Sequence, residues 1–311
     1  MSKKVFVLGS INVDLMINTP RLPEKGETIL GSNFRISMGG KGANQAASCG
    51  LLGTETIFIG NVGNDDFADL ALEDLENNFS IDTRFIRRKN DISTGTAVIT
   101  QVDNDNVIIV DSGANMTIDL DQVHSALNEA NEGDVFLAQF EVDFDLVKES
   151  LKLAKAKHMY TIINPAPANE IPDDMLKDID CLILNQSETE ILSGIYPEDL
   201  DSCIEAKEIL SSKGVKALLF TLGANGCLYI DENLEVEVPG ERVKVVDTTG
   251  AGDSFIGAYV SSMVKGNSIE ASLKFANAYA AFNCTNRGAR SGLKRFGTYA
   301  ELVKGLEKFK S

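Results

Sequence analysis

The stretch DVFLAQF at residues 134–140 is long and apolar enough to form a buried β-strand. A helical pattern follows over residues 143–157, where Asp143 can cap the first turn and apolar residues recur on one face. A second apolar run, YTIIN, comes directly afterwards at 160–164. A strand, a helix and another strand in this order predict two parallel strands joined by a crossing helix.

The same alternation extends over most of the chain in both directions. Four more apolar runs are predicted to be strands: VFVLG (5–9), TIFIGNV (56–62), CLILN (181–185) and ALLFTLG (217–223). Their apolar residues are continuous rather than alternating, which is typical of strands that helices cover on both faces. The sequence therefore predicts a single three-layer α/β/α domain over residues 1–311, with a mostly parallel central sheet.

Two segments break this pattern. Residues 12–37 hold VDLMI, a turn region and TILGSNFRIS, and residues 94–110 hold TGTAVITQ and NVIIV on either side of VDNDN. The second segment has the form of a β-hairpin. Together they favour a small separate sheet that acts as a lid over the carboxyl ends of the main strands, where open α/β sheets bind their ligands. Two ordinary hairpins at the edges of the main sheet are the alternative.

The net charge of the chain limits the classes of partner that it is expected to bind. It carries 46 acidic and 29 basic residues among 311, a net charge of −17. Such a surface repels phosphate backbones and anionic lipids, so neither a nucleic acid nor a membrane is expected as a partner. The sequence has no run of about 20 apolar residues that would span a bilayer. Asn12 and Asp14 interrupt the apolar run that begins at Val5, so this run is too short for a signal peptide and none is expected.

The cysteines and histidines exclude several other chemistries. The five cysteines are odd in number and scattered without a CxxC pair, so disulfide frameworks and zinc ribbons are not expected. Reduced, mostly buried thiols in the cytoplasm are the natural interpretation. The two histidines, His124 and His158, lie in charged stretches and are predicted to be exposed to solvent. Neither fits a metal-binding HExxH motif or a Ser-His-Asp site.

Two glycine-rich segments resemble phosphate-binding loops only superficially. The first strand leads into GSINVD, which lacks the later glycines of the dinucleotide fingerprint GxGxxG. The segment MGGKGANQ has Arg35 where a P-loop requires its first glycine, and Gly42 where it requires serine or threonine. The sequence therefore predicts neither a dinucleotide-binding fold nor a P-loop.

The most informative stretch is VVDTTGAGDSFIGAYVSSMV at 245–264. A strand-like VKVVD runs into TTGAGD, and a helical pattern begins near Gly250. Gly250, Ala251 and Gly252 have little or no side chain, so their backbone amides can converge on a phosphate at the helix N-terminus. Asp253, in the first turn, can then take the proton from a hydroxyl that attacks this phosphate. A glycine-rich turn with Asp253 as a simple capping acid is the alternative.

Several ordered motifs together point to a known family. GGKGANQAA (39–47) and DTTGAGDSF (247–255) match its two signatures, and GSINVD (9–14), NPAPA (164–168) and NQSE (185–188) occur in the expected order. With these motifs, essentially the whole chain resembles the PfkB-type carbohydrate kinases, and most closely the branch that phosphorylates D-ribose. The resemblance implies transfer of the γ-phosphate of ATP to O5 of D-ribose, giving D-ribose 5-phosphate and ADP.

The resemblance implies that Asp253 is the catalytic base and that the amides of Gly250, Ala251 and Gly252 stabilise the transferring phosphoryl group. It also implies a set of sugar-binding residues, which are Asn12, Asp14, Gly39, Gly40, Lys41, Asn44, Glu141 and Asp253. A carboxylate and an amide can pair with neighbouring hydroxyls of a sugar. For Glu141, a charge that caps a helix is the alternative.

The resemblance further implies an ATP site. Its residues would be Asn185, Glu188, Thr221, Gly223, Ala224, Gly226, Gly252 and Asn277. Asn185 and Glu188 match an NxxE pair that serves the phosphates and Mg²⁺, which prefers oxygen ligands and usually keeps several waters. Asn277 stands where the family contacts adenine, and a purely structural role is its alternative.

Members of this branch also use a monovalent cation, usually K⁺, and pair into homodimers through their lids. The matching cation residues are Asp247, Thr249, Asn283, Asn286, Gly288 and Gly292, the last four largely through backbone atoms. The stretch NCTNRGARSG departs from the family in several side chains, which puts this site in doubt. Arg287 and Arg290 flank Gly288, and solvent exposure is favoured over phosphate contact for both. Exposed strand edges in the lid would be a liability in a monomer, which supports a homodimer.

Three other functions are weighed against D-ribose phosphorylation. Another kinase of the family would act on deoxyribose, fructose, a phosphosugar or a nucleoside, although Asp14 and Glu141 beside Lys41 favour a neutral sugar. A catalytically silent sugar-binding regulator would have no use for a base at Asp253. A nicotinamide-dependent oxidoreductase lacks its GxGxxG motif. Measuring ADP release across a panel of sugars would identify another kinase of the family. Sugar binding without turnover would indicate a silent regulator, and NAD binding would indicate an oxidoreductase.

Overall fold

A nine-stranded sheet forms the centre of the molecule in the computed structural model, which describes residues 3–102 and 105–310. The strand order is β13-β12-β11-β10-β9-β8-β1-β4-β5. The strands are β1 (Val5–Leu8), β4 (Thr56–Gly63), β5 (Asp82–Lys89), β8 (Val135–Gln139), β9 (Tyr160–Asn164), β10 (Cys181–Asn185), β11 (Ala217–Thr221), β12 (Gly226–Ile230) and β13 (Glu235–Pro239). All neighbours are parallel except at β12 and β13, and the six strands expected from apolar runs are confirmed.

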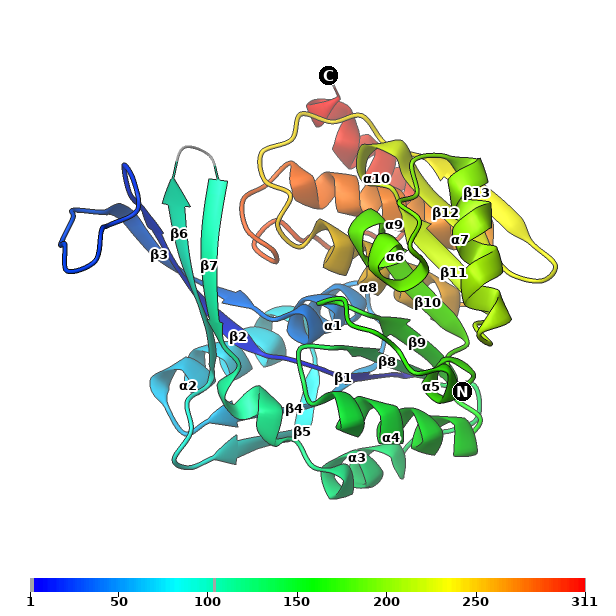
Figure 1. Ribbon diagram of the computed structural model, residues 1–311, viewed down its shortest axis with the longest axis horizontal. Coiled ribbons are helices and arrows are strands. Elements are labelled where there is room, and N and C mark those ends of the chain that lie inside the picture. The colour runs from blue at the N-terminus through cyan, green and yellow to red at the C-terminus, as the bar shows by residue number, and fades with distance from the viewer. Residues whose placement is uncertain (1–2, 103–104, 311) are drawn as a thin grey trace.

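Helices cover both faces of this sheet (Figure 1). One face carries α1 (Lys41–Leu51), α2 (Asp66–Glu73), α8 (Ala251–Val264), α9 (Ile269–Cys284) and α10 (Tyr299–Leu306). The other carries α3 (Leu120–Leu127), α4 (Phe144–Ala156), α5 (Asp173–Leu176), α6 (Gln186–Ser193) and α7 (Leu200–Ser212). The predicted three-layer α/β/α architecture is confirmed.

Strand β1 shows why the apolar runs are continuous. Val5 and Val7 pack into the core beneath α1 and α8, whereas Phe6 and Leu8 pack into the core beneath α3 and α4. Successive side chains of a strand point to opposite faces, so a strand between two helical layers needs an apolar residue at every position. All four residues are fully buried.

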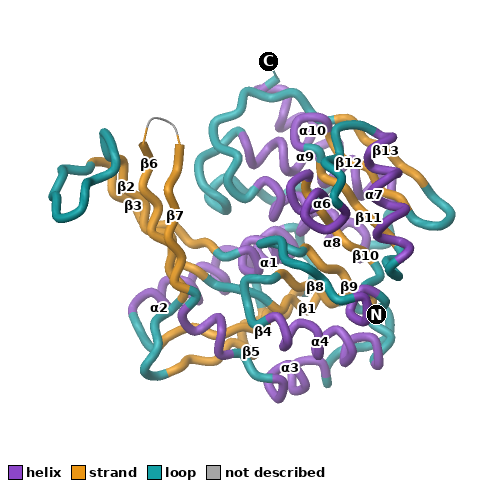
Figure 2. Tube along the Cα trace, viewed as in Figure 1, coloured by secondary structure: helices purple, strands orange, loops and turns teal. Residues whose placement is uncertain are grey.

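A second sheet of four strands stands apart from the main one (Figures 1 and 2). We call it the small sheet; its strands are β3 (Ser32–Gly39), β2 (Asn12–Asn18), β6 (Gly95–Val102) and β7 (Asp105–Asp111), in that order. The separate sheet predicted from the two alternating segments is confirmed, and the alternative of two edge hairpins is wrong. β6 and β7 form the predicted antiparallel hairpin, although residues 103–104 of its turn lie outside the described part.

One predicted strand is absent. The segment VKVVD (243–247) has no strand conformation, and Val245 and Val246 are more than half exposed. Its amides are satisfied elsewhere, because Val246 donates to the carbonyl of Cys284 at 2.8 Å and Lys244 to that of Phe309 at 2.8 Å. The segment therefore lies across helix ends instead of extending the sheet.

The buried helices are short and interrupted by polar residues. Within the described residues, none combines the length and apolar character that crossing a lipid bilayer requires. All five cysteines are free, and four of them are buried.

Candidate active site

The first turn of α8 offers unoccupied backbone amides. Gly250 caps the helix in the left-handed region with φ 72°, and a Cβ there would lie 2.7 Å from Ala289. In the described residues, no protein acceptor is recorded for the amides of Gly252 and Asp253. A Cβ added to Gly252 would meet nothing within 4 Å. Free amides that face open space at a helix N-terminus form a site for an anion.

The carboxylate of Asp253 is held from a neighbouring helix. Asn44 Nδ2 donates to its Oδ2 at 2.9 Å and Gln45 Nε2 to its Oδ1 at 3.0 Å, both from α1. Only 8% of the residue is exposed. Burial raises the pKa of Asp253, while Lys41 and these two amides act in the opposite direction. Because its recorded partners are side chains of α1, Asp253 does not act as a capping acid for its own helix.

Gln45 also connects Asp253 to the nucleotide side of the site. The same Nε2 donates to Asn164 Oδ1 at 3.2 Å, and Asn164 Nδ2 donates to Glu188 Oε2 at 3.3 Å. Gln139 Nε2 in turn donates to Gln45 Oε1 at 2.6 Å. This buried chain orients the side chains on which catalysis would depend. Gln45 and Asn164 lie within the motifs GGKGANQAA and NPAPA, but nothing in the sequence alone indicates that they take part in this chain.

Asn185 and Glu188 form the capping box of α6. Glu188 N donates to Asn185 Oδ1 at 2.8 Å, and Asn185 N donates to Glu188 Oε2 at 2.9 Å. Burial raises the pKa of Glu188, against the effect of its hydrogen bonds and of Lys41. The spacing NxxE therefore places a buried carboxylate at the carboxyl end of β10, next to Asp253's network.

Two adjoining cavities meet at the head of α8. The larger has a volume of about 780 Å³, and the smaller, of about 180 Å³, reaches Lys41, Glu188 and Asp253. Both are lined by Asn185, Thr221 and Gly252. The residues predicted for ATP that line the larger cavity are Asn185, Thr221, Gly223, Ala224, Gly226, Gly252 and Asn277. The structure thus brings the predicted nucleotide residues together around one space that ends at Asp253.

Asn277 makes a structural hydrogen bond and also lines a cavity. Its Nδ2 donates to the carbonyl of Pro239 at 2.6 Å, which ties α9 to the end of β13. The residue also lines the larger cavity. A structural bond and a place in the cavity wall are therefore compatible.

The predicted sugar-binding residues gather where the small sheet joins α1. Asn12 pairs with Gly39 between β2 and β3, and a Cβ on Gly39 would lie 2.5 Å from the carboxylate of Asp14. Burial raises the pKa of Asp14 to about 6; Arg290 opposes this rise and Glu141 adds to it. The structure places the carboxylate of Asp14 directly over the glycine turn.

A residue missed by the sequence analysis orients Asn12. The buried Asn115 donates through Nδ2 to Asn12 Oδ1 at 2.8 Å and accepts from the amide of Ile11 at 2.9 Å. Its segment DSGANM carries no motif, so nothing in the sequence distinguished it.

Glu141 lies between two turns. Its Oε2 accepts from the backbone amide of Lys41 at 2.9 Å and from the hydroxyl of Ser10. Glu141 therefore bonds to the first turn of α1, whereas the helix at its own strand-to-helix corner, α4, is capped by Asp143. Burial acts to lower the pKa of Lys41, but Asp253, Glu141 and Glu188 together raise it, so the ammonium remains charged among three carboxylates.

The predicted cation residues fall into two groups. Asp247 accepts from the amide and hydroxyl of Thr249 at 2.9 and 2.7 Å, and from the amide of Gly288 at 2.9 Å. Asn283 Nδ2 donates to the carbonyls of Thr249 and Ala289, each at 3.3 Å. Asn286 and Gly292 lie against each other, with recorded contacts to neither Asp247 nor Thr249.

The two arginines beside Gly288 differ from each other. Arg287 is exposed, as predicted, but Arg290 is buried, and the expectation of solvent exposure is wrong for it. Its guanidinium finds partners far away in the sequence: Asp74, Met38 and Gly39. His124 and His158 are both exposed, as predicted.

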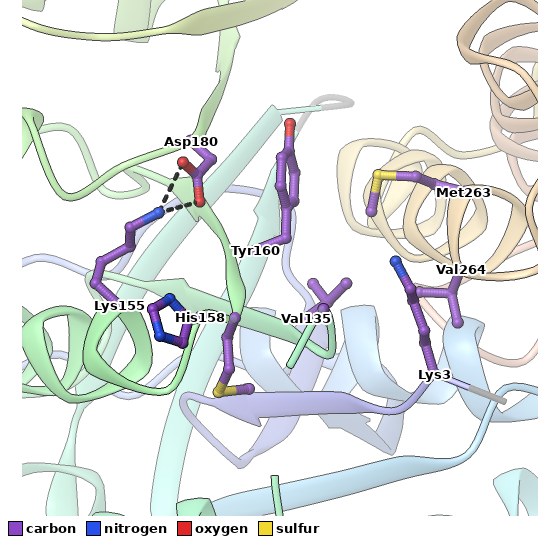
Figure 3. Close-up of a pocket in the computed structure, with 10 residues that line it drawn as sticks. Lys3, Val135, Lys155, His158, Tyr160, Asp180, Met263 and Val264 are labelled. Carbon is purple, nitrogen blue, oxygen red and sulfur yellow. Dashed lines mark hydrogen bonds and ion pairs between the residues drawn. The ribbon is translucent and has the colours of Figure 1, made fainter. Parts of the chain in front are cut away.

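A further cavity, of about 430 Å³, lies at the amino ends of β8 and β9 (Figure 3). It is lined by Tyr160 at the start of β9 and by Met263 near the end of α8, far along that helix from Asp253. Lys155 donates to both carboxylate oxygens of Asp180 beside it, at 2.8 and 2.7 Å. Lys155 and Asp180 are thus paired with each other, and among the described residues the cavity shares no lining residue with the two cavities at the head of α8.

The chain belongs to the pfkB family of carbohydrate kinases, whose model matches residues 2–295. Its relatives include a ribokinase of Haemophilus influenzae, 34% identical over 99% of each chain, and a deoxyribokinase of Salmonella typhi, 32% identical over 96% of this chain and 99% of its own. Among solved structures, Arabidopsis thaliana ribokinase complexed with ribose and ATP matches with a TM-score of 0.90 at 31% identity, covering 99% of both chains. The resemblance read from the motifs is confirmed.

Proposed function

We propose that this protein is a ribokinase, which transfers the γ-phosphate of ATP to O5 of D-ribose and releases D-ribose 5-phosphate and ADP. The observation that carries the proposal is the buried Asp253 carboxylate beside the free amides of Gly252 and Asp253. Nucleotide-sized space lies on one side of it and the Asp14–Gly39 turn on the other. The ribokinases and the ribose–ATP complex among the relatives support D-ribose as the acceptor.

In this proposal Asp253 accepts the proton of the primary hydroxyl as its oxygen attacks the γ-phosphate. A positioned base of this kind contributes about a hundredfold to ten-thousandfold in rate. The amides at the head of α8 stabilise the charge that develops on the phosphoryl oxygens. Asn12, Asp14 and Glu141 hold the sugar, and the small sheet acts as a lid that excludes water, which otherwise competes as acceptor.

Mg²⁺ is proposed to bind together with ATP. Among the described residues, no cluster of three or more His, Cys, Asp or Glu side chains forms a metal site. The buried carboxylate of Glu188 nevertheless suits an ion held mainly by phosphate oxygens and waters, because Mg²⁺ retains much of its water shell. When bound, Mg²⁺ would offset the charge of the triphosphate.

A monovalent cation, K⁺, is proposed beside the turn that precedes Gly250. Asn283 Oδ1 is a buried acceptor for which the described residues record no donor, and the carbonyls of Thr249 and Ala289 lie next to this side chain. Burial acts to raise the pKa of Asp247, but hydrogen bonds from Thr249 and Gly288 lower it, so the carboxylate is charged. Replacing K⁺ by Na⁺ or tetramethylammonium should reduce activity; indifference to the cation would make Asp247 and Thr249 purely structural.

We also propose a homodimer formed through the small sheets. Every described residue of β7 is exposed, and Ile109 is 68% and Phe34 62% exposed. β3, which carries Phe34, and β7, which carries Ile109, are the two edge strands of the small sheet, and exposed apolar side chains on edge strands are typical of a surface that another chain covers. Ile109→Asp should convert the dimer to a monomer in sedimentation equilibrium. The free cysteines fit a reducing compartment, and we propose the cytoplasm.

The direct test is ADP release with D-ribose, 2-deoxy-D-ribose, D-fructose and adenosine as acceptors. The proposal expects kcat/KM to be highest for D-ribose, with D-ribose 5-phosphate as the product identified by NMR. The panel includes 2-deoxyribose because one relative is a deoxyribokinase. A higher kcat/KM for 2-deoxyribose or fructose would overturn the ribose assignment and leave the family unchanged.

A further inference from the structure

Arg290 is a buried cation beside the proposed kinase site, and the proposed function gives it no role. Only 4% of its side chain is exposed. Removing a guanidinium from water is unfavourable unless its N–H groups find acceptors and its charge finds a partner. A buried arginine therefore indicates a place where the fold uses its particular geometry.

The guanidinium donates three hydrogen bonds, which reach two segments of the chain. Nη1 donates to Asp74 Oδ2 at 2.9 Å, Nη2 to the carbonyl of Gly39 at 2.9 Å, and Nε to the carbonyl of Met38 at 3.3 Å. The rigid planar fork of arginine suits such divergent acceptors, whereas the single ammonium of lysine does not reach all three. One side chain thus holds two consecutive backbone carbonyls and a carboxylate.

The segments that Arg290 joins belong to opposite sides of the site. Met38 and Gly39 end β3, where the small sheet passes into α1 and where the carboxylate of Asp14 lies against Gly39. Ala289, which precedes Arg290, packs against Gly250 at the head of α8. The hydrogen bonds to Met38 and Gly39 are therefore on the sugar side, and the contact of Ala289 with Gly250 is on the phosphate side.

The turn that carries Arg290 is itself fixed on the phosphate side. Gly288 N donates to Asp247 Oδ2 at 2.9 Å, and Asn283 Nδ2 holds the carbonyl of Ala289 at 3.3 Å. A movement of the Met38–Gly39 segment would thus be transmitted through a short, rigid link to the residue that abuts Gly250.

We propose that Arg290 is a positioning residue that sets the sugar-binding turn and the phosphate-binding amides relative to each other. The inference rests on the proposed sugar kinase activity. Arg290 lies close enough to Asp14 and Asp253 to interact with both charges, in addition to its ion pair with Asp74. Its guanidinium opposes the raised pKa of Asp14 and so favours the charged form at the sugar side.

The test compares Arg290→Met with Arg287→Met, which removes an exposed arginine from the same turn. For Arg290→Met we expect kcat/KM for the sugar to fall about tenfold to a hundredfold, because small displacements of bound groups have effects of this size. The KM for ATP should stay within about twofold. Arg287→Met should match the wild type. Each variant is assayed at a temperature where circular dichroism shows it to be folded.

A double variant separates positioning from stability. Arg290→Met removes the ion-pair partner of Asp74, a carboxylate whose side chain is only 19% exposed, so the Tm of this variant should fall. Arg290→Met combined with Asp74→Asn removes that charge and should recover most of the Tm. Sugar KM should stay raised, and the amides of 38–44 should exchange hydrogen faster than in the wild type. Arg290→Lys, which keeps the charge but loses the fork, should also keep a raised sugar KM.

Recovery of both Tm and sugar kinetics in the double variant would overturn the proposal, because Arg290 would then only stabilise the fold. Wild-type sugar kinetics in Arg290→Met would overturn it equally. All variants are measured with the sugar that the wild-type protein phosphorylates best. An error in the ribose assignment would therefore change the sugar used and leave the comparison intact.

Discussion

Two helices of this protein begin with the same backbone geometry but differ in whether the amides of their first turns are hydrogen-bonded. α1 follows Gly40 and α8 follows Gly250, and both glycines cap their helix with positive φ, 88° and 72°, without a side-chain hydrogen bond. At the head of α1 the amide of Lys41 is bonded to Glu141, and that of Ala43 to the carbonyl of Ser10 at 3.0 Å.

At the head of α8 the amide of Ala251 donates to the carbonyl of Thr248 at 3.1 Å, whereas those of Gly252 and Asp253 have no recorded protein acceptor in the described residues. A helix N-terminus attracts an anion only while its amides are free, and Glu141 already supplies one at α1. The difference supports our proposal that the transferred phosphate binds at α8, whereas α1 supplies the side chains of Asn44 and Gln45 that bond to Asp253. Residues 100 positions apart in the sequence create this difference.

The strongest test of this division is Asp253→Asn. The amide keeps the shape of the side chain but cannot accept the proton of the sugar hydroxyl, so kcat should fall about a thousandfold or more. Affinities for sugar and ATP should change little, as measured by titration calorimetry beside the ADP-release assay. Turnover near the wild-type rate would remove Asp253 from the role of base.

Gly40→Ala should damage the folded state of the α1 turn. The new Cβ would lie 2.7 Å from the carbonyl oxygen of Ser10 and 2.8 Å from the amide of Asn12, at a backbone φ that disfavours alanine. We expect the free energy of unfolding in urea to fall by about 3 kcal/mol. Gly194→Ala is the control, because Gly194 has a similar φ of 80° but nothing within 4 Å of its Cβ position, and should cost only about 1 kcal/mol. Equal losses in both variants would show that close packing at Gly40 is unimportant.

Gly252→Ala, in contrast to Gly40→Ala, should leave the stability of the fold intact and lower activity. Gly252 lies inside α8 without a positive φ, and its Cβ would enter open space. Stability should stay equal or rise by about 0.5 to 1 kcal/mol, because alanine is the better helix former. The methyl group would project where the phosphate approaches, so kcat should fall about tenfold to a hundredfold. An unchanged kcat in this variant would argue that the phosphate binds elsewhere.

Much of the fold was predictable because local sequence decides it. A strand between two helical layers must be apolar throughout, as in Val5–Leu8, and such runs are visible without any tertiary information. The segment VKVVD shows the limit of this reasoning. Its apolar residues suggested a strand, but its amides bond to the end of α9 and to the C-terminal segment. Partners that lie far away in the sequence decided its conformation.

The site shows the same limit. Roles for Asp253, Asn185 and Glu188 could be predicted because short motifs contain these residues. Arg290 was misjudged because its acceptors, Asp74 and Gly39, lie 216 and 251 positions away. No property of its own neighbourhood, a polar glycine-rich turn, indicates that the folded chain encloses it.

The smallest expected effect is the change of the KM for ribose with pH, which depends on Asp14. Burial raises the pKa of Asp14 from its ordinary 3.8 to about 6. Only the carboxylate accepts hydrogen bonds from two sugar hydroxyls, so lowering the pH from 7 to 5 should raise the KM for ribose by about fivefold to tenfold. The KM for ATP should change much less. A ribose KM that is flat across this range would separate Asp14 from sugar binding.

The raised pKa of Asp14 also affects stability: the charged carboxylate that favours sugar binding is unfavourable to the folded state. Between about pH 4 and pH 6 the folded state binds more protons at Asp14 than the unfolded state does, so the contribution of this group to stability falls as the pH rises through that window. At pH 7 the buried charge is therefore unfavourable to the fold. Asp14→Asn should raise the free energy of unfolding at pH 7 by about 1 kcal/mol while weakening ribose binding. Below pH 4 the variant and the wild type should be equally stable, and a stability difference independent of pH would contradict this account of Asp14.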